Sequence, residues 1–191
     1  MSDFRELESF RIIDRKLVFQ GRLLALEELE VSSPAGELAV REAVRHPGAI
    51  AVLPVMADLS VVLCKQYRAP IDDVILEVIA GKLKAGESPQ ECARRELAEE
   101  AGLAAESLEE LAVFFTSPGF TDEVMHAFLA RGIATLNDDN QSNRHGIEEI
   151  HMELVRVRLR EWPRLVEERL VRDAKSIVTL ALAARYLGLE D

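Results

Sequence analysis

One helix has both of its ends marked in the sequence, and this feature constrains the fold most. Ser88 and Glu91 form an S-x-x-E capping box, and Pro89 occupies the first helical position. Gly102 provides the stop signal at the other end. Because apolar runs typical of strands precede and follow it, the helix predicted over residues 89–101 must belong to a fold that combines helices with sheet.

Short apolar runs separated by turn signals predict strands along most of the remaining chain. Residues 16–45 are hairpin-rich, with SSPAGE as a turn, and residues 72–80 are expected to form one strand. The other predicted strands are AIAVLPVM, VVLCKQYR, ELAVFF, EVMHAFLARG and HMELVRVRL. Two helices are expected near the C-terminus, around residues 162–168 and over residues 174–187. The second would bury a face formed by Ile177, Leu180, Ala181 and Ala184.

Length and composition limit the organisation and the partners. A chain of 191 residues is long enough for one main core with a small appendage. The formal net charge of −11 opposes binding to nucleic acid or anionic lipid, which relies on Lys and Arg. No apolar stretch approaches the ~20 residues needed to cross a bilayer, and the acidic start MSDFRELESF does not resemble a secretory signal. We therefore expect a cytoplasmic protein that binds neither nucleic acid nor membrane.

The cysteines and histidines do not suggest a site of their own. Cys64 lies in an apolar run and Cys92 in a helical pattern, and neither has a CxxC neighbour. We expect both to be small buried hydrophobic residues. The four histidines show no mutual spacing typical of metal ligands, so we interpret them as structural.

Three glutamates of the predicted helix lie on one arc of its surface. Glu96, Glu99 and Glu100 stand at positions i, i+3 and i+4, where like charges repel unless solvent screens them or a cation lies between them. Arg95 is flanked by Glu91 and Glu99 on its own side and would brace the cluster. Mg²⁺ prefers carboxylate and carbonyl oxygens and often binds substrate phosphates as well. From the helix alone, a solvated acidic surface is still the commoner explanation.

The wider spacing changes this balance. Residues 81–103 follow the pattern G-x5-E-x7-R-E-U-x-E-E-x-G-U, in which U is a bulky aliphatic residue. A chance match to its specified positions is on the order of one in a billion per starting point. The pattern is that of the Nudix box, and by it the chain is identified as a member of the Nudix hydrolase family.

The resemblance implies a fold and a reaction. Nudix proteins set the box as a loop-helix-loop on an α/β/α sandwich with a mixed sheet, and we expect this α/β fold here, together with an N-terminal antiparallel β segment. Within the box, Glu87 would support the geometry of the loop. Such proteins hydrolyse nucleoside diphosphates linked to another moiety with the help of Mg²⁺, for which Mn²⁺ is the alternative ion. A small-molecule nucleoside diphosphate derivative is therefore the expected substrate.

The match to the box also implies the metal ligands. Glu96 and Glu100 are the leading ligands of Mg²⁺, and Glu99 is a further ligand. The carbonyl of Ala80 commonly joins them. Arg95 would orient the carboxylates, so that Glu99 and Arg95 both belong to the expected catalytic set. In the family, metal ions neutralise the diphosphate and lower the pKa of a bound water.

Features outside the box resemble the ADP-ribose pyrophosphatase subgroup. Pro118 stands sixteen residues after Gly102, within the segment SPGFTDE, as it does in that subgroup. The Arg-Glu pair at residues 41–42, the KQYR segment that ends at Arg68, and LEVIAG before the box are further similarities. We expect Pro118 and Gly119 to line the substrate site, whereas a simple proline-glycine turn between two strands is the alternative.

In relatives of this subgroup an N-terminal β-rich segment swaps onto a partner subunit. Residues 1–45 fit that role as a dimerisation segment, with residues 46–191 as the Nudix domain, so the resemblance implies a homodimer. Phe19 of this segment would stack on the nucleotide base in one interpretation, but a position in the core is favoured.

The same resemblance suggests side chains that contact the substrate. Arg41 and Glu42 would contact the adenosine part. Arg68 would reach ribose or phosphate, although a surface arginine at a strand end is an equally good interpretation. Glu123 lies in the segment SPGFTDE, residues 117–123, which we call the SPG loop. It would help to place the terminal ribose.

The general base is expected in the polar segment NDDNQSNRHGIEEI. Relatives often supply a glutamate from a mobile loop after the proline, and Glu148 and Glu149 follow a polar, glycine-containing stretch. We favour Glu149 as the base, with Glu148 as its alternative. That both are ordinary loop charges is an equally good interpretation.

The preferred function is metal-dependent hydrolysis of ADP-ribose to AMP and ribose 5-phosphate. A nucleotide-sugar pyrophosphatase acting on a compound such as GDP-mannose is the alternative within the same class, because the sequence does not reveal which base is bound. A non-catalytic nucleotide sensor is disfavoured, since the chain keeps every glutamate of the box.

Overall fold

The computed structural model describes residues 10–136 and 151–189. By its contacts the chain divides into two compact units. One consists of residues 1–47 and 117–123, and the other of residues 48–116 and 124–191. The SPG loop, far from the N-terminus in sequence, thus groups with the N-terminal strands, a grouping that the sequence does not predict.

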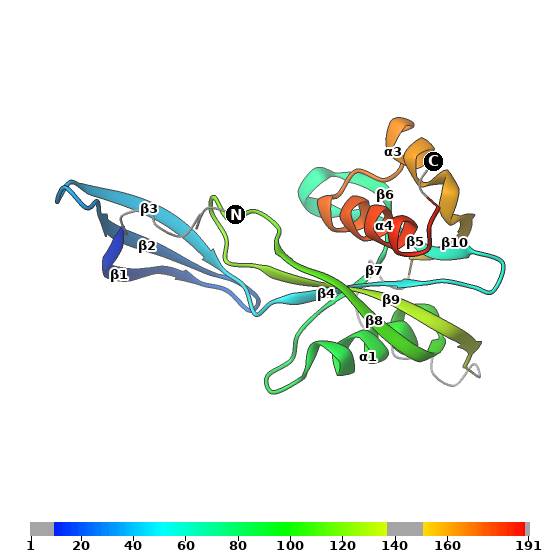
Figure 1. The fold of residues 1–191 in the computed structure, drawn as a ribbon. Helices are drawn as coiled ribbons and strands as arrows, with labels where there is room; N and C mark the ends of the chain where they lie inside the picture. Colours follow the sequence, from blue (N-terminus) through cyan, green and yellow to red (C-terminus); the bar gives the residue numbers. More distant parts are fainter. Residues whose placement is uncertain (1–9, 137–150, 190–191) are drawn as a thin grey trace. The chain divides into compact units, whose positions relative to one another are not determined.

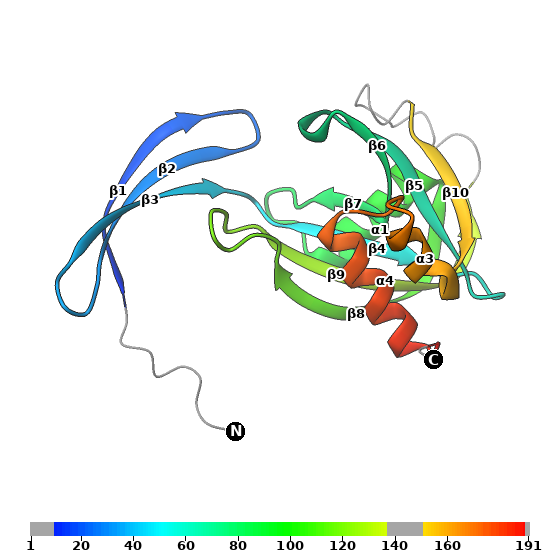
Figure 2. The ribbon, with the colours of Figure 1, turned by 90° about the horizontal axis from the view of Figure 1, so that it is seen from above.

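The first unit contains a three-stranded antiparallel sheet (Figure 2). Its strands, in spatial order, are β1 (Arg11–Gln20), β2 (Ala25–Ser32) and β3 (Leu38–Arg45). The SSPAGE turn joins β2 to β3. Here Gly36 adopts a φ of +85°, a conformation that favours glycine, and donates its N–H to the Ser33 carbonyl. The hairpin-rich start predicted from the sequence is confirmed.

Strand β1 is exposed along its whole length. The expectation that Phe19 lies in the core is therefore wrong, because its side chain is 62% exposed. Apolar periodicity identifies a strand but does not show whether anything covers it.

The second unit is built on a four-stranded mixed sheet. Its strands, in spatial order, are β7 (Ile79–Lys82), β4 (Ala49–Pro54), β9 (Val124–Thr135) and β8 (Leu103–Phe115). Strand β4 runs parallel to β9 and antiparallel to β7, while β8 and β9 form a long antiparallel pair. Parallel strands need a crossover connection, and the chain between β4 and β9 contains the predicted helix. The mixed sheet expected from the resemblance is confirmed.

A second sheet of this unit is antiparallel, in the order β10-β5-β6. It comprises β10 (Glu153–Arg158), β5 (Ser60–Arg68) and β6 (Asp73–Glu77), with the 3-10 turn η1 (Ala69–Ile71) between β5 and β6. The single strand predicted over residues 72–80 is wrong, because the chain leaves β6 at Glu77 and enters β7 of the other sheet at Ile79. Hydrophobicity reports burial, but not the sheet to which a strand belongs.

The helices are α1 (Pro89–Ala101), α3 (Trp162–Glu167) and α4 (Ala174–Tyr186), with the 3-10 turn η3 (Leu159–Glu161) before α3. Figure 1 shows α1 and α4 on opposite faces of the four-stranded sheet. Alternation along β4 explains this arrangement, since Leu53 packs in the cluster of α4 whereas Ile50 and Val52 pack in that of α1. The predicted α/β sandwich is confirmed. None of the described helices is long and apolar enough to cross a membrane.

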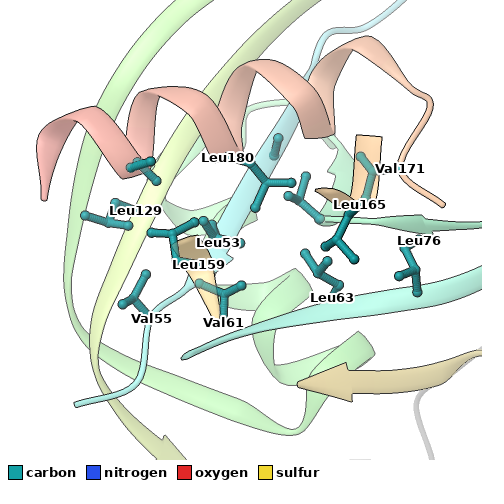
Figure 3. Packing of buried hydrophobic residues seen from close by; sticks show 14 of the residues in the cluster. Leu53, Val55, Val61, Leu63, Leu76, Leu129, Leu159, Leu165, Val171 and Leu180 are labelled. Carbon is teal, nitrogen blue, oxygen red and sulfur yellow. The ribbon is translucent and has the colours of Figure 1, made fainter. Parts of the chain in front are cut away.

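The core beneath α4 joins the two sheets of the second unit (Figure 3). Leu53 and Leu129 come from the four-stranded sheet, Val61 and Leu63 from the antiparallel sheet, and Leu180 from α4. Burying one such side chain contributes about 1.5–3 kcal/mol to folding. This cluster therefore holds β5 and β6 in place against α4.

The buried face of α4 differs in part from the predicted one. Leu180 and Ala184 are buried as expected, but Ile177 and Ala181 are only half-buried. Ser176 is fully buried instead, and its hydroxyl oxygen accepts a backbone N–H from the segment between β6 and β7 at 3.0 Å. A buried hydroxyl is stable when it is hydrogen-bonded in this way. The apolar pattern alone does not reveal such a polar contact.

Candidate functional site

Helix α1 is anchored at both ends and along its inner face. Ser88 Oγ accepts the Glu91 N–H at 3.3 Å, and a Glu91 carboxylate oxygen accepts the Ser88 N–H at 2.8 Å. Gly102 ends the helix in the left-handed region, with a φ of +63°. Ala93 and Leu97 are fully buried. The helix bounds, the capping box and the stop signal predicted from the sequence are confirmed.

Arg95 lies at the centre of what we call the α1 acidic cluster, formed by Glu87, Glu96 and Glu99. Its Nε donates to Glu87 Oε1 at 2.7 Å, and its Nη1 donates to Glu96 Oε1 at 2.6 Å and Glu99 Oε2 at 3.0 Å. Arg95 thus braces the cluster as predicted, whereas the carboxylate of the flanking Glu91 is used in the helix cap. Three carboxylates surround this one guanidinium, and Lys84 Nζ lies 4.0 Å from Glu99 Oε1, so the cluster and its two cations keep an excess of one negative charge.

Gly81 allows strand β7 to approach this cluster closely. A Cβ atom added at Gly81 would lie 1.9 Å from Glu96 Oε1, so a larger residue would collide with the carboxylate. Glu96 is itself buried, with 11% of its side chain exposed. The glycine thus makes a cradle in which the glutamate oxygens and the β7 backbone share one small space.

The donor set of this cradle fits a hard divalent cation. Carboxylate oxygens of Glu96, Glu99 and Glu100 lie along one arc of α1, and Ala80 precedes the glycine in β7. Oxygen donors of this kind suit Mg²⁺ and Mn²⁺. Within residues 10–136 and 151–189, however, no three such side chains already converge on one point. Arg95 is paired with Glu96 and Glu99, so a cation would compete with the guanidinium for their oxygens.

The surroundings of Glu87 and Cys92 shift the pKa values of these two side chains. The hydrogen bond from Arg95 lowers the pKa of Glu87 to about 2, and the same carboxylate raises the pKa of Arg95. Burial raises the pKa of Cys92 to about 12. A thiol is nucleophilic only as the thiolate, so Cys92 is excluded as a nucleophile. Cys64 and Cys92 are both buried, as expected, and neither forms a disulfide.

The structure describes the predicted metal ligands but not the predicted general base. Glu96 is buried, while Glu99 and Glu100 are half-buried on the same helix. Their roles as metal ligands remain predictions. Glu148 and Glu149 lie outside the described residues, so the choice of general base also remains a prediction.

Arg68, at the end of β5, forms a two-pronged ion pair with Glu77. Its Nε and Nη2 donate to the two carboxylate oxygens of Glu77 at 2.6 and 2.8 Å. The Glu77 side chain is only 1% exposed, whereas that of Arg68 is 37% exposed. Lys175 of α4 pairs with the same carboxylate. Burial alone would raise the pKa of Glu77, but the two cations outweigh it and keep this pKa below its ordinary value.

Glu77 and Lys175 are not among the site residues predicted from the sequence. One signal was present, since Glu77 is the only charged residue in the apolar run VILEVIA. A carboxylate in a buried strand must be paired, because leaving it unpaired costs several kcal/mol. The sequence thus indicates that a cationic side chain pairs with Glu77, but it does not show which residue supplies the cation.

The SPG loop of the first unit is attached to the end of β3. The Val44 N–H donates to the Phe120 carbonyl at 2.7 Å. Asp122 accepts from Arg45 Nη1 at 3.0 Å and from the His46 N–H at 2.9 Å. These contacts explain why the loop belongs to the same compact unit as the N-terminal strands.

The remaining predicted substrate residues also lie in the first unit. Pro118 and Gly119 are exposed in the turn of the SPG loop, and the Glu123 side chain is 25% exposed. Arg41 and Glu42 are exposed on β3. The α1 acidic cluster lies in the second unit, so the structure of each unit by itself does not test these contacts.

Comparison with known proteins adds independent evidence. The chain matches the NUDIX domain model over residues 44–173. It is 39% identical over 181 residues to the ADP-ribose pyrophosphatase of Bacillus subtilis (strain 168), which covers 95% of this chain and 94% of that protein. It is 36% identical over 182 residues to the methanol dehydrogenase activator of Bacillus methanolicus, with 95% and 94% covered. In fold it resembles the crystal structure of an ADP compounds hydrolase, with a TM-score of 0.82, 23% identity, and 96% and 97% of the two chains covered. The chain belongs to the Nudix family.

Proposed function

We propose that this Nudix protein is a pyrophosphohydrolase that cuts the diphosphate bond of ADP-ribose to give AMP and ribose 5-phosphate. The observation that carries the proposal is the 39% identity over 95% of the chain to an ADP-ribose pyrophosphatase, together with a complete Nudix box over residues 81–103, which includes α1. The SPG loop and the arginine at the end of β5 agree with that substrate. The expected cytoplasmic location remains a prediction.

We further propose that Mg²⁺ is held by Glu96, Glu99 and Glu100 with the carbonyl of Ala80. The excess negative charge that remains in the α1 acidic cluster after its pairs with Arg95 and Lys84 supports this assignment, since a cation relieves it. Bound there, the cation supplies charge neutralisation and Lewis-acid activation at the diphosphate. Arg95 orients the carboxylates of Glu96 and Glu99 through its hydrogen bonds. Mn²⁺ has the same preference for oxygen donors and is the alternative ion.

The other predicted residues bind and orient the substrate in this proposal. Arg68 presents a guanidinium to a phosphate or ribose oxygen, and Glu123 places the terminal ribose. Arg41 and Glu42 contact the adenosine part. A glutamate of residues 137–150, with Glu149 preferred to Glu148, takes the proton of the attacking water.

A homodimer is part of the same proposal. The first unit exposes large apolar side chains on its sheet, among them Ile12 (45%), Leu17 (55%) and Val40 (61%). Apolar surface of this kind is typical of an interface, and a second copy of the chain is the partner that the family resemblance suggests. Light scattering after gel filtration should give twice the chain mass. The mass of a single chain would contradict the dimer and leave the reaction untouched.

The reaction is tested by incubating the protein with ADP-ribose and Mg²⁺ and quantifying AMP and ribose 5-phosphate. GDP-mannose, NADH and a diadenosine polyphosphate serve as competing substrates, and EDTA serves as the control. Strong preference for ADP-ribose that EDTA abolishes supports the proposal. Metal-dependent turnover of GDP-mannose instead would replace the substrate and keep the mechanism. Binding of ADP-ribose without turnover would favour a nucleotide sensor.

A further inference from the structure

A buried carboxylate, that of Glu77, joins the start of helix α4 to Arg68 at the end of β5. Glu77 at the end of β6 receives Arg68 from β5 and Lys175 from α4. Lys175 Nζ also donates to Asp173 Oδ2 at 2.7 Å. Asp173 caps the helix, because the same oxygen accepts the Ser176 N–H at 3.1 Å. Within this group two carboxylates face two cations, so the charges balance.

The chain before α4 runs along the edge of β6 that does not pair with β5. The Leu76 N–H donates to the Leu170 carbonyl at 2.9 Å, and Arg172 Nη2 donates to Asp73 Oδ2 at 2.7 Å. Beyond them, Ser176 Oγ accepts the N–H of the residue after Glu77 at 3.0 Å. The segment from residue 170 to 176 is therefore aligned with β6 at both ends, and Lys175 reaches Glu77 from a defined position.

Arg68 lies on the face of its sheet that packs against α1. Alternate residues of a strand share a face, so Arg68 is on the same face as Cys64. Cys64 packs in the hydrophobic cluster that contains Leu97 of α1. Glu77 is the main cause of the raised pKa of Arg68, and Glu100 of the Nudix helix contributes as well. The guanidinium is thus within electrostatic reach of the box.

We propose that Lys175 is a positioning residue for substrate binding: it pins the Glu77 carboxylate so that both oxygens accept from Arg68, which fixes the guanidinium for a phosphate or ribose oxygen. The inference rests on the substrate role assigned to Arg68 in the proposed function. A carboxylate that binds both prongs of a guanidinium sets its plane as well as its position. Lys175 adds a second cation to the buried carboxylate, which keeps Glu77 ionised and in one orientation.

The effect should appear in substrate affinity. With Lys175→Met, the KM for ADP-ribose should rise about tenfold, which corresponds to about 1.4 kcal/mol, while kcat and the Mg²⁺ concentration for half-activation change less than about twofold. Lys175→Arg should restore most of the affinity because it keeps the charge. Asp173→Asn retains a side chain that can cap the helix, but it removes the negative charge that pairs with Lys175. This variant should give a smaller rise in KM than Lys175→Met.

The matched control is Lys65→Met, on the same strand as Arg68. Lys65 forms an exposed pair with Glu153 at 3.0 Å, and surface pairs of this kind contribute little. Its KM should stay at the wild-type value. Thermal melting and circular dichroism of every variant separate loss of affinity from loss of fold, and the milder Asp173→Asn variant keeps the test valid if Lys175→Met unfolds.

A double-mutant cycle with Arg68→Ala identifies the route. If Lys175 acts through Arg68, Lys175→Met should add nothing to the KM of Arg68→Ala. Additive effects would overturn the inference, as would a lowered melting temperature with an unchanged KM. An Arg68→Ala variant with normal KM would also overturn it, although turnover of ADP-ribose by the wild-type enzyme would leave the proposed reaction standing. If the wild type binds ADP-ribose without turnover, the proposed reaction fails, and the same cycle is read from calorimetric Kd values.

Discussion

Two clusters of the second unit are made of the same chemical groups but differ in charge balance. In the α1 acidic cluster, three carboxylates surround Arg95. Around Glu77, two carboxylates meet two cations, and the central carboxylate is 1% exposed. The first cluster keeps an excess of negative charge on partly buried side chains, whereas the second neutralises its charges around a fully buried carboxylate.

This difference indicates a division of labour. An acidic excess is costly unless a cation from outside joins it, so the α1 acidic cluster should respond strongly to divalent metal. A balanced buried group needs nothing from outside, but it is sensitive to the loss of any member because an unpaired buried charge is costly. Changes in the first cluster should therefore affect catalysis, and changes in the second should affect folding and the position of Arg68.

The largest expected effect is that of Glu100→Gln on turnover. A neutral amide is a poorer ligand for Mg²⁺, so kcat/KM for ADP-ribose should fall on the order of 10³-fold, or about 4 kcal/mol of transition-state stabilisation. The melting temperature without metal should stay close to that of the wild type. Steady-state assays with Mg²⁺ test this, with exposed Glu109→Gln on β8 as the control. Wild-type rates in Glu100→Gln would remove the argument for a metal site.

Next in size is the loss of stability in Glu77→Ala, which removes the carboxylate between Arg68 and Lys175. Breaking a buried pair in this way should lower the free energy of unfolding by about 3 kcal/mol. Urea denaturation in EDTA measures it. The control is Glu153→Ala, whose exposed pair with Lys65 should be worth less than about 1 kcal/mol. Equal losses in the two variants would erase the distinction between buried and surface clusters.

A third prediction concerns pH and Glu87. Its pKa is lowered from 4.5 to about 2, chiefly by the hydrogen bond from Arg95. A lowered acid pKa stabilises the fold above the unfolded pKa, and this contribution disappears as pH falls from 4.5 towards 2. Without metal, Glu87→Gln should be less stable than the wild type by about 2 kcal/mol at neutral pH, a value typical of a charge-assisted hydrogen bond. If the difference in stability between the wild type and Glu87→Gln did not shrink on acidification, the charge of Glu87 would not be the cause of that difference.

The smallest expected effect is that of Ser88→Ala at the start of α1. Removing the cap should lower the free energy of unfolding by about 1 kcal/mol. Ser88→Asp, which keeps a capping oxygen, should retain the wild-type value. Chemical denaturation without metal compares the two variants. An uncapped helix that retained full stability would mean that the buried contacts of Ala93 and Leu97 alone hold α1 in place.

Much of the fold could be predicted because its signals are local. The bounds of α1 follow from Ser88, Pro89 and Gly102, which act on backbone groups a few residues away. The strands follow from apolar runs. The path between residues 72 and 80 could not be predicted, since the change of sheet after Glu77 depends on which strands are neighbours in space. The exposure of Phe19 was missed for the same reason.

The sequence by itself determined the α1 acidic cluster as a group on one helix, because fixed spacing along a helix places Glu96, Glu99 and Glu100 on one arc. It also carried the family resemblance. Only the tertiary structure decided the partners of Glu77, one of which lies 9 residues away and the other 98. No local pattern encodes such a pairing. It forms because a buried carboxylate must be neutralised and the packing of α4 against the sheets brings Lys175 within reach.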